Sequence, residues 1–197
     1  GLGMVYQHFT PVPAMPVAEN LVLARDDVPA VVNWSKETTE LEDFLARMPF
    51  KVPLKARVSD ISAGERQKCE ILKQLYLKPS FLILDEPTSV LTPAEADDVL
   101  GVLRAMVVSG ELTILMITHK FREVMAFADD VTILRRGKLA GHGRGADLTP
   151  DEMARTMIGA EQLTVQPART GEVTAARLEL DKLHALDDAG APAVRDG

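Results

Sequence analysis

The sequence predicts an α/β fold built on a parallel sheet, and three observations support this prediction. Residues 81–84 form a continuous apolar run, as expected of a parallel strand that is buried on both faces, and residues 112–117, apolar except for Thr113, indicate a second buried strand. A predicted helix precedes the first run, and another helix separates the two runs. Strands and helices that alternate in this way are typical of α/β domains. The chain of 197 residues is long enough for one domain with its own hydrophobic core.

The first 60 residues carry weaker signals. Residues 1–7 look like the end of a strand, so we expect the chain to begin inside a domain rather than at its edge. Residues 10–60 mix prolines with short helical segments, and apolar residues recur at helical spacing in the segment 38–48. We interpret residues from about 10 to 75 as a helical subdomain inserted into the α/β fold.

The later elements are predicted from helix caps and turn residues. Pro79 ends one helix, and capping boxes with proline at the first helical position open two others, at Thr92–Glu95 and Thr149–Glu152. Arg136-Gly137 is a turn signal between two short strands. The predicted order is a helix 62–78, a strand 81–84, a helix from Thr92 to near Gly110, a strand 112–117, a helix 120–128, paired strands 131–134 and 138–141, and a short helix that ends at Gly159.

The composition changes after residue 160. Residues 161–172 are polar and contain Pro167 and Gly171, which indicates a linker. Residues 173–183 are strand-like, and 189–192 are typical of a turn. We therefore expect a second domain to begin at about residue 173 and to continue to the end of the sequence.

Composition narrows the class of protein. The chain is 46% hydrophobic and 26% charged, as in soluble globular proteins, and its net charge of −7 argues against a nucleic-acid partner. Cys69 is the only cysteine, so no internal disulfide can form, which suits a reducing compartment. No apolar run is long enough for a membrane span, and the start has no signal-peptide pattern. Any membrane association is therefore expected to come through a partner.

Acidic residues follow the first predicted strand, and a histidine follows the second. Asp85 and Glu86 come at the carboxyl end of the run 81–84, where open α/β sheets bind ligands. Asp85 suits the hydration shell of Mg²⁺, and Glu86 suits the activation of a water molecule that attacks a γ-phosphate. His119 can orient the same water. The alternatives are an acidic pair exposed to solvent and a structural histidine.

Two further signals are ambiguous by themselves. Ser62-Ala63-Gly64-Glu65 opens a helix and is either a capping box or a phosphate site, because both use a hydroxyl and free amides at a helix N-terminus. Gln7 follows the first strand-like segment and can bind Mg²⁺ or water through its amide oxygen. The glycine-rich segment 141–145 is interpreted as a loop, and the remaining histidines lack the spacing of a metal site held by the protein.

The order of these motifs resembles the ATP-binding subunits of ABC transporters over about residues 1–160. Gln7 is similar to the Q-loop glutamine, 61–67 to the LSGGQ-type signature, and 81–86 to Walker B with its catalytic glutamate. Residues 89–91 fall in the D-loop, and His119 is similar to the switch histidine. The resemblance implies a P-loop NTPase fold of the ABC type that binds ATP and Mg²⁺.

The resemblance also implies a role for each residue. Glu86 is expected to be the general base, and His119 the sensor of the γ-phosphate. Asp85 and Gln7 are expected to bind Mg²⁺ and water. Ser62, Gly64 and Glu65 belong to the signature, which caps the γ-phosphate of a nucleotide that the opposite ABC domain holds.

A narrower resemblance concerns importers of simple sugars and nucleosides. Segments 17–21, 70–76, 91–95 and 118–125 are similar to these ATPases, which carry two ABC domains in one polypeptide. Residues 173–197 resemble the opening hairpin of the second domain. The implied partners are membrane permease subunits docked on the helical subdomain, a second ABC domain that is fused or dimeric, and indirectly a periplasmic or lipoprotein solute-binding protein. The implied location is peripheral, on the cytoplasmic face of the cell membrane.

The sequence departs from the family pattern in one important respect. It contains no G-x-x-x-x-G-K-[ST] loop to bind phosphates, and such a loop is expected to lie upstream of residue 1. The 197 residues alone are therefore expected to lack activity. Two alternatives stay open, namely an ABC ATPase of DNA repair or translation and a catalytically silent scaffold.

Overall fold

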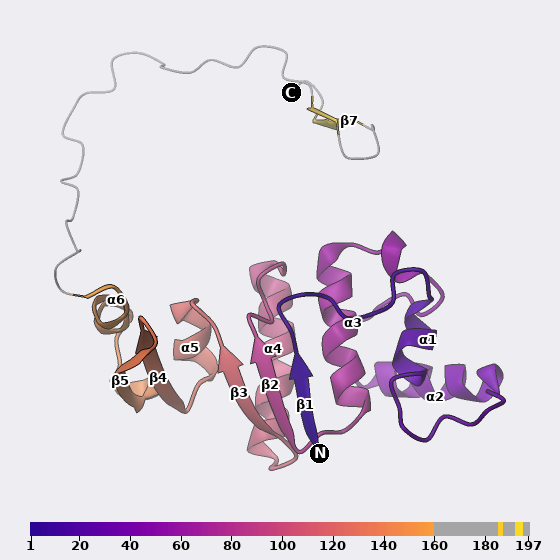
Figure 1. Ribbon diagram of the computed structural model, residues 1–197, viewed down its shortest axis with the longest axis horizontal. Helices are drawn as coiled ribbons and strands as arrows, with labels where there is room; N and C mark the ends of the chain where they lie inside the picture. Colours follow the sequence, from indigo (N-terminus) through magenta and orange to yellow (C-terminus); the bar gives the residue numbers. More distant parts are fainter. Residues whose placement is uncertain (160–184, 187–191, 195–197) are drawn as a thin grey trace. The chain divides into compact units, whose positions relative to one another are not determined.

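A computed structural model of the chain describes residues 1–159, 185–186 and 192–194. The chain divides into two compact units, Gly1–Ala160 and Glu161–Gly197. The first unit contains the sheet and the helices that are labelled in Figure 1. In the second unit the described residues form two short antiparallel strands, β6 (Ala185–Leu186) and β7 (Pro192–Val194). The predicted linker 161–172 and the strand-like segment 173–183 lie outside the described residues.

A parallel sheet of three strands forms the centre of the first unit, in the order β1-β2-β3. Its strands are β1 (Leu2–Val5), β2 (Phe81–Asp85) and β3 (Thr113–Ile117). Val5 is paired with Leu84, and Asp85 with Ile117, so the carboxyl ends of all three strands meet at one edge. The predicted parallel sheet is confirmed.

Six α-helices and two short 3-10 helices complete the described part of the first unit. They are α1 (Val17–Val22), α2 (Trp34–Ala46), η1 (Val58–Asp60), α3 (Ala63–Tyr76), α4 (Pro93–Val108), α5 (Phe121–Phe127), η2 (Gly145–Asp147) and α6 (Pro150–Ile158). The helix predicted over 38–48 begins earlier, because the Asn33 side chain accepts a hydrogen bond from the backbone N–H of Lys36 and caps α2. No described helix combines the length and the apolar character that a membrane crossing requires.

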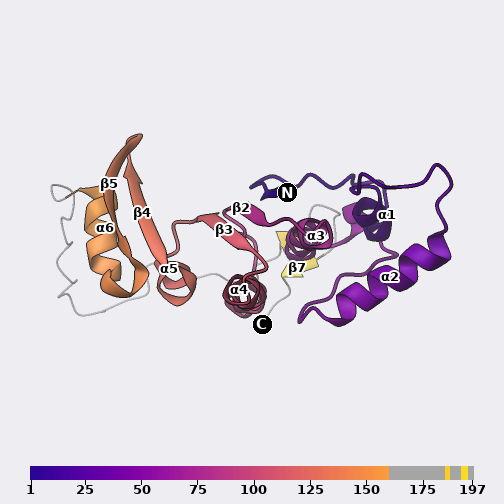
Figure 2. The same cartoon turned by 90° about the horizontal axis from the view of Figure 1, so that it is seen from below.

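The core lies between the sheet and the helices α3 and α4. Val5, Leu82 and Leu84 are fully buried on the sheet and join one apolar cluster with α3 and α4. Figure 2 shows both helices on the same side of the strands. Because each helix connects parallel strands, α3 and α4 run opposite to them and begin at the level of the carboxyl edge.

The opposite face of the sheet departs from the prediction. Leu2 is 71% exposed, Leu115 52% and Ile117 50%, so the described part of the chain leaves these side chains largely uncovered. The prediction of a strand buried on both faces is therefore wrong for β3, whereas Phe81 and Ile83 on the same face of β2 are half-buried. An apolar run indicates that both faces of a strand can be buried, but it does not indicate which elements pack against each face. An apolar face of this kind is typical of an interface.

The hairpin that follows the sheet is longer than predicted. Strand β4 (Asp130–Arg135) pairs with β5 (Lys138–Arg144) across Arg136-Gly137, which both have positive φ, as a tight two-residue turn requires. Residues 141–144, predicted as a loop, belong to β5. Glycine leaves room at position 141, since an added Cβ would lie 3.1 Å from the Thr156 methyl group of α6 and would require that side chain to shift by a few tenths of an ångström.

Backbone pairing joins the segment after β1 to the segment before α3. The N–H of Val17 donates to the carbonyl of Ala56 at 3.0 Å, and the N–H of Val58 donates to that of Met15 at 3.1 Å. The buried Asn20 side chain fixes the same segment, since it accepts from the N–H of Val12 at 2.6 Å and donates to the Pro16 carbonyl at 3.1 Å. These bonds therefore fix the segment that follows β1 against the segment that precedes α3.

We predict that Leu84→Ala lowers the free energy of unfolding by about 2–5 kcal/mol, because Leu84 is fully buried in the central strand and its truncation leaves a cavity. The matched control is Leu115→Ala on the exposed face, for which we expect a loss below about 1 kcal/mol. Urea unfolding followed by far-ultraviolet circular dichroism measures both. Equal losses would contradict the assignment of the two faces.

Candidate functional site

The polar residues at the carboxyl edge of the sheet form the candidate site. Strand β2 ends at Asp85, and Glu86 follows in the left-handed region with φ of 50°. Its backbone N–H donates to the carbonyl of Ile117 at 2.9 Å, which fixes this turn to the end of β3. A left-handed conformation costs a non-glycine residue about 1–3 kcal/mol, and such strain concentrates at functional sites.

Glu86 and His119 contact each other directly. Nδ1 of His119 lies 2.7 Å from Oε1 of Glu86, although the two residues follow different strands. The Glu86 side chain is 22% exposed and that of His119 64%, so both are accessible to solvent and ligand. A partly buried carboxylate beside an imidazole can accept a proton from a water molecule and hold that water in one orientation. The sequence predicted both residues at strand ends but not their contact.

Gln7 and Asp85 lie at the same edge. Gln7 is exposed in the loop after β1, and Asp85 is half-buried at the end of β2. The described residues contain no group of three or more His, Cys, Asp or Glu side chains that could hold a metal ion. These two oxygen donors therefore suit Mg²⁺ only in the way that is common in phosphoryl transfer, where phosphates and water supply the other ligands.

Ser62 and Glu65 form a capping box, which was one of the two interpretations of this segment from the sequence. The Ser62 hydroxyl accepts from the Glu65 N–H at 3.2 Å, and Oε2 of Glu65 accepts from the Ser62 N–H at 2.9 Å. Hydrogen bonds that Ser62 donates to the Glu65 carboxylate, first from its backbone N–H and then from its hydroxyl, hold the pKa of Glu65 below its usual range. Ser62 is exposed, so a ligand can reach the N-terminus of α3. Capping does not exclude phosphate binding, because the amides at a helix N-terminus serve both.

The N-terminal part of α3 packs against the segment that opens α4. A Cβ at Gly64 would lie 3.6 Å from the Leu91 side chain and 3.7 Å from the Val90 carbonyl. Nζ of Lys68 lies 2.6 Å from Oε1 of Glu95. The Lys68 ammonium, followed by the N–H and the hydroxyl of Thr92, lowers the pKa of Glu95 to about 2. These contacts fix the beginnings of α3 and α4 relative to each other.

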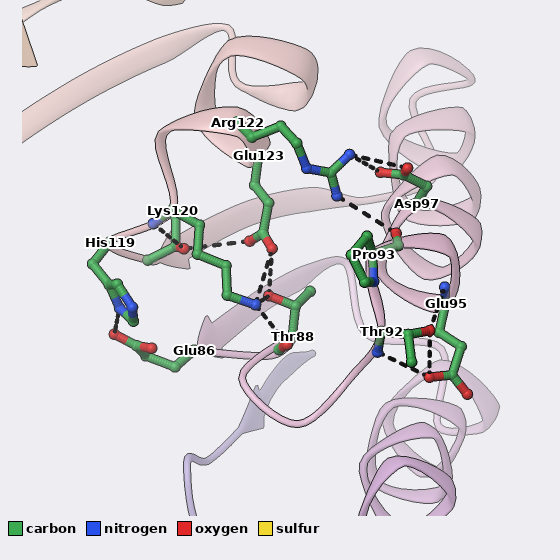
Figure 3. A network of polar contacts seen from close by, with 11 residues as sticks. Glu86, Thr88, Thr92, Pro93, Glu95, Asp97, His119, Lys120, Arg122 and Glu123 are labelled. Carbon is green, nitrogen blue, oxygen red and sulfur yellow. Dashed lines mark hydrogen bonds and ion pairs between the residues drawn. The ribbon is translucent and has the colours of Figure 1, made fainter. Parts of the chain in front are cut away.

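A buried polar network beside the Glu86–His119 pair was missed from the sequence (Figure 3). Glu123 of α5 is 1% exposed and contacts Thr88, Thr118 and Lys120. The available signal was a single acidic residue among the apolar residues of 121–127. That signal is weak, because a glutamate in the first turn of a helix is also favoured by the helix dipole.

Comparison with known proteins identifies the family. A family profile described as ABC transporter matches residues 1–89. The nucleoside import ATP-binding protein NupA of Lactococcus lactis is 34% identical over 197 residues, which cover 99% of this chain and 38% of that protein. The guanosine import ATP-binding protein NupO of Bacillus subtilis is 36% identical over 197 residues, covering 100% of this chain and 38% of that protein.

The chain belongs to the ABC transporter ATP-binding family. It spans about two fifths of the length of these two relatives (38%). A metal-chelate-type ABC transporter in an inward-facing conformation has a TM-score of 0.67 at 23% identity, over 80% of this chain and 63% of that one. A dimeric bacterial ABC transporter cassette has a TM-score of 0.62 at 20% identity, over 72% and 62%. The predicted fold class, an ABC-type P-loop NTPase with an α/β core, is confirmed.

We predict that the capping box of helix α3 contributes to the free energy of unfolding in a pH-dependent way. Because the pKa of Glu65 is lowered in the folded chain, the stabilisation is complete above the ordinary glutamate pKa and is lost as pH falls through the lowered value. Ser62→Ala removes a capping hydroxyl and is expected to cost about 1 kcal/mol at pH 7. The difference from the wild type, measured by urea unfolding, should stay constant from pH 7 to about pH 5 and shrink as the pH falls below the ordinary glutamate pKa of 4.5. A difference that grows on acidification would contradict this assignment.

Proposed function

We propose that this protein is the ATP-hydrolysing subunit of an ABC importer for a simple sugar or a nucleoside. The observation that carries the proposal is the Glu86–His119 pair, 2.7 Å apart at the carboxyl edge of a parallel sheet. Relatives with similar sequences are named import ATP-binding proteins for nucleosides, guanosine and ribose. The substrate class rests on these names, and the chemistry rests on the geometry.

The proposed reaction is hydrolysis of the terminal phosphoanhydride bond of ATP. Glu86 accepts a proton from water while the water oxygen forms a bond to the γ-phosphorus. The bond between that phosphorus and the β,γ-bridging oxygen breaks, and ADP leaves with its electron pair. His119, held by Glu86, keeps the water and the γ-phosphate in line. Positioning and charge stabilisation supply most of the catalysis in reactions of this kind.

The nucleotide is bound by this chain together with a second ABC domain. Asp85 and Gln7 offer the oxygen donors that Mg²⁺ prefers, and bound Mg²⁺ neutralises phosphate charge. The 197 residues contain no glycine-rich phosphate loop with its lysine, so their own donors do not suffice to hold the phosphates. Ser62, Gly64 and Glu65 at the beginning of α3 then contact the γ-phosphate of a nucleotide that the other domain holds. That domain is either fused in the same protein or supplied by another subunit.

The helical subdomain suits a membrane partner. An open, mostly apolar groove of about 480 Å³ lies between α2 and the segment 51–55, and its charged residues are Glu42, Lys51 and Lys55. These properties suit an amphipathic segment of a permease subunit on the cytoplasmic face of the membrane. The backbone pairs between 15–17 and 56–58 connect the groove to the loop of Gln7 and to α3. A solute-binding protein would act through the permease only.

We predict that Glu86→Gln, in the protein assembled with its permease and second ABC domain, lowers kcat for ATP hydrolysis by about 10²- to 10⁴-fold. ATP binding should persist, because an amide keeps the shape of the side chain but is a very weak base. The control is Glu111→Gln, at an exposed position in the loop after α4. Phosphate release and nucleotide binding are measured for both. Near-normal hydrolysis by Glu86→Gln refutes the proposed base, and a wild-type assembly that binds ATP without hydrolysis supports a silent scaffold.

A matched pair of caps separates phosphate binding from helix capping. Ser62 and Thr149 each form a complete capping box, with Glu65 and Glu152 respectively, but Thr149 opens α6. We expect Ser62→Ala and Thr149→Ala each to cost about 1 kcal/mol of stability. Only Ser62→Ala should also reduce ATP hydrolysis by the assembled protein, by about tenfold or more. Equal hydrolysis in both variants would show that Ser62 acts as a cap alone.

A further inference from the structure

We propose that Glu123 is a positioning residue that fixes the loop of Glu86 relative to the loop of His119. The inference rests on the proposed function, because it assigns to Glu123 the alignment of the hydrolytic pair. Figure 3 shows Glu123 between the two loops, with dashed lines to both. Glu123 has no contact with either member of the pair and acts through the residues beside them.

The network connects positions next to each member of the pair. Oε1 of Glu123 accepts from the Thr88 hydroxyl at 2.6 Å, and Thr88 is two residues after Glu86. Oε2 accepts from the Thr118 hydroxyl at 3.3 Å, and Thr118 immediately precedes His119. One carboxylate thus joins the loop after β2 to the loop after β3, and each of its oxygens serves a different loop.

Lys120 completes the connection from the other side of His119. Its Nζ donates to the Thr88 carbonyl at 2.7 Å and lies 3.4 Å from Oε1 of Glu123. Its backbone N–H donates to the Thr118 hydroxyl at 3.1 Å. Both neighbours of His119 are therefore held against Thr88 and Glu123. The position of the imidazole relative to Glu86 follows from these bonds and from the bond between the Glu86 N–H and Ile117.

The burial of Thr88 and Glu123 strengthens the connection between the two loops. Thr88 and Glu123 are each 1% exposed, so bulk water cannot replace the hydroxyl that Glu123 loses if the loops separate. A buried carboxylate left without its donors carries a large desolvation cost. Separation of the two loops is therefore opposed at Glu123, whereas the exposed Glu86–His119 contact alone opposes it much less.

The test compares a variant at Thr88 that removes the hydroxyl with one that keeps it. Thr88→Val keeps the shape of the side chain and removes the donor, and Thr88→Ser keeps the donor. Glu123→Gln keeps one acceptor oxygen and removes the charge that faces Lys120. The matched control is Glu37→Gln, at a buried carboxylate that is paired with Arg25 in the helical subdomain.

Two measurements are made on each variant. Hydrogen exchange of the full chain reports the opening of the loops at 85–89 and 118–121, without any need for ATP. Steady-state hydrolysis by the assembled protein reports kcat and KM for ATP. For Thr88→Val and Glu123→Gln we expect about tenfold faster exchange in these two loops, and kcat lower by roughly 10- to 100-fold at an almost unchanged KM. Thr88→Ser and Glu37→Gln should remain near wild type in both.

The outcomes decide separately on the two proposals. Unchanged exchange and kcat in Thr88→Val overturn the positioning role. Faster exchange throughout the first unit, α6 included, also overturns it, because the network would then serve general stability only. If the wild-type assembly does not hydrolyse ATP, the proposed function fails, and exchange at the two loops alone decides whether Glu123 positions them.

Discussion

The pairing of β2 between β1 and β3 is the constraint on which the other features depend. Parallel pairing in this register brings three carboxyl ends to one edge, although the residues that follow them are far apart in the sequence. The buried side chains of Leu82 and Leu84 hold β2 against α3 and α4, and both helices begin at that edge. Glu86, His119 and the beginning of α3 therefore share one side of the fold.

Three sets of polar contacts connect this edge to the rest of the first unit. The backbone pairs of 15–17 with 56–58 join the helical subdomain to α3, and the ion pair of Lys68 with Glu95 joins α3 to α4. The contacts of Glu123 join the loops after β2 and β3. A displacement at the helical subdomain can therefore reach Glu86 through packed elements.

The sequence predicted the elements well where local chemistry determines them. Capping boxes opened α3, α4 and α6 as expected, and the Arg136-Gly137 turn produced the hairpin. The prediction from the sequence failed where tertiary packing determines the structure. The glycine-rich segment 141–144 became a strand because it pairs with β4, and β3, predicted to be a buried strand, is exposed on one face. For the site, motif order predicted Glu86 and His119, but no local pattern reports that Glu123 contacts two loops at once.

The backbone of Glu86 limits which residues can replace it. At φ of 50°, glycine fits without strain, and asparagine and aspartate fit more easily than other side chains. Glutamate is thus an unfavourable choice for the turn and a necessary one for a general base. Selection for stability alone would favour replacing it, so a chain that has lost its catalytic role should drift toward glycine or asparagine here. Under the proposed function, stability and activity are opposed at this residue, as is common where a site requires strain.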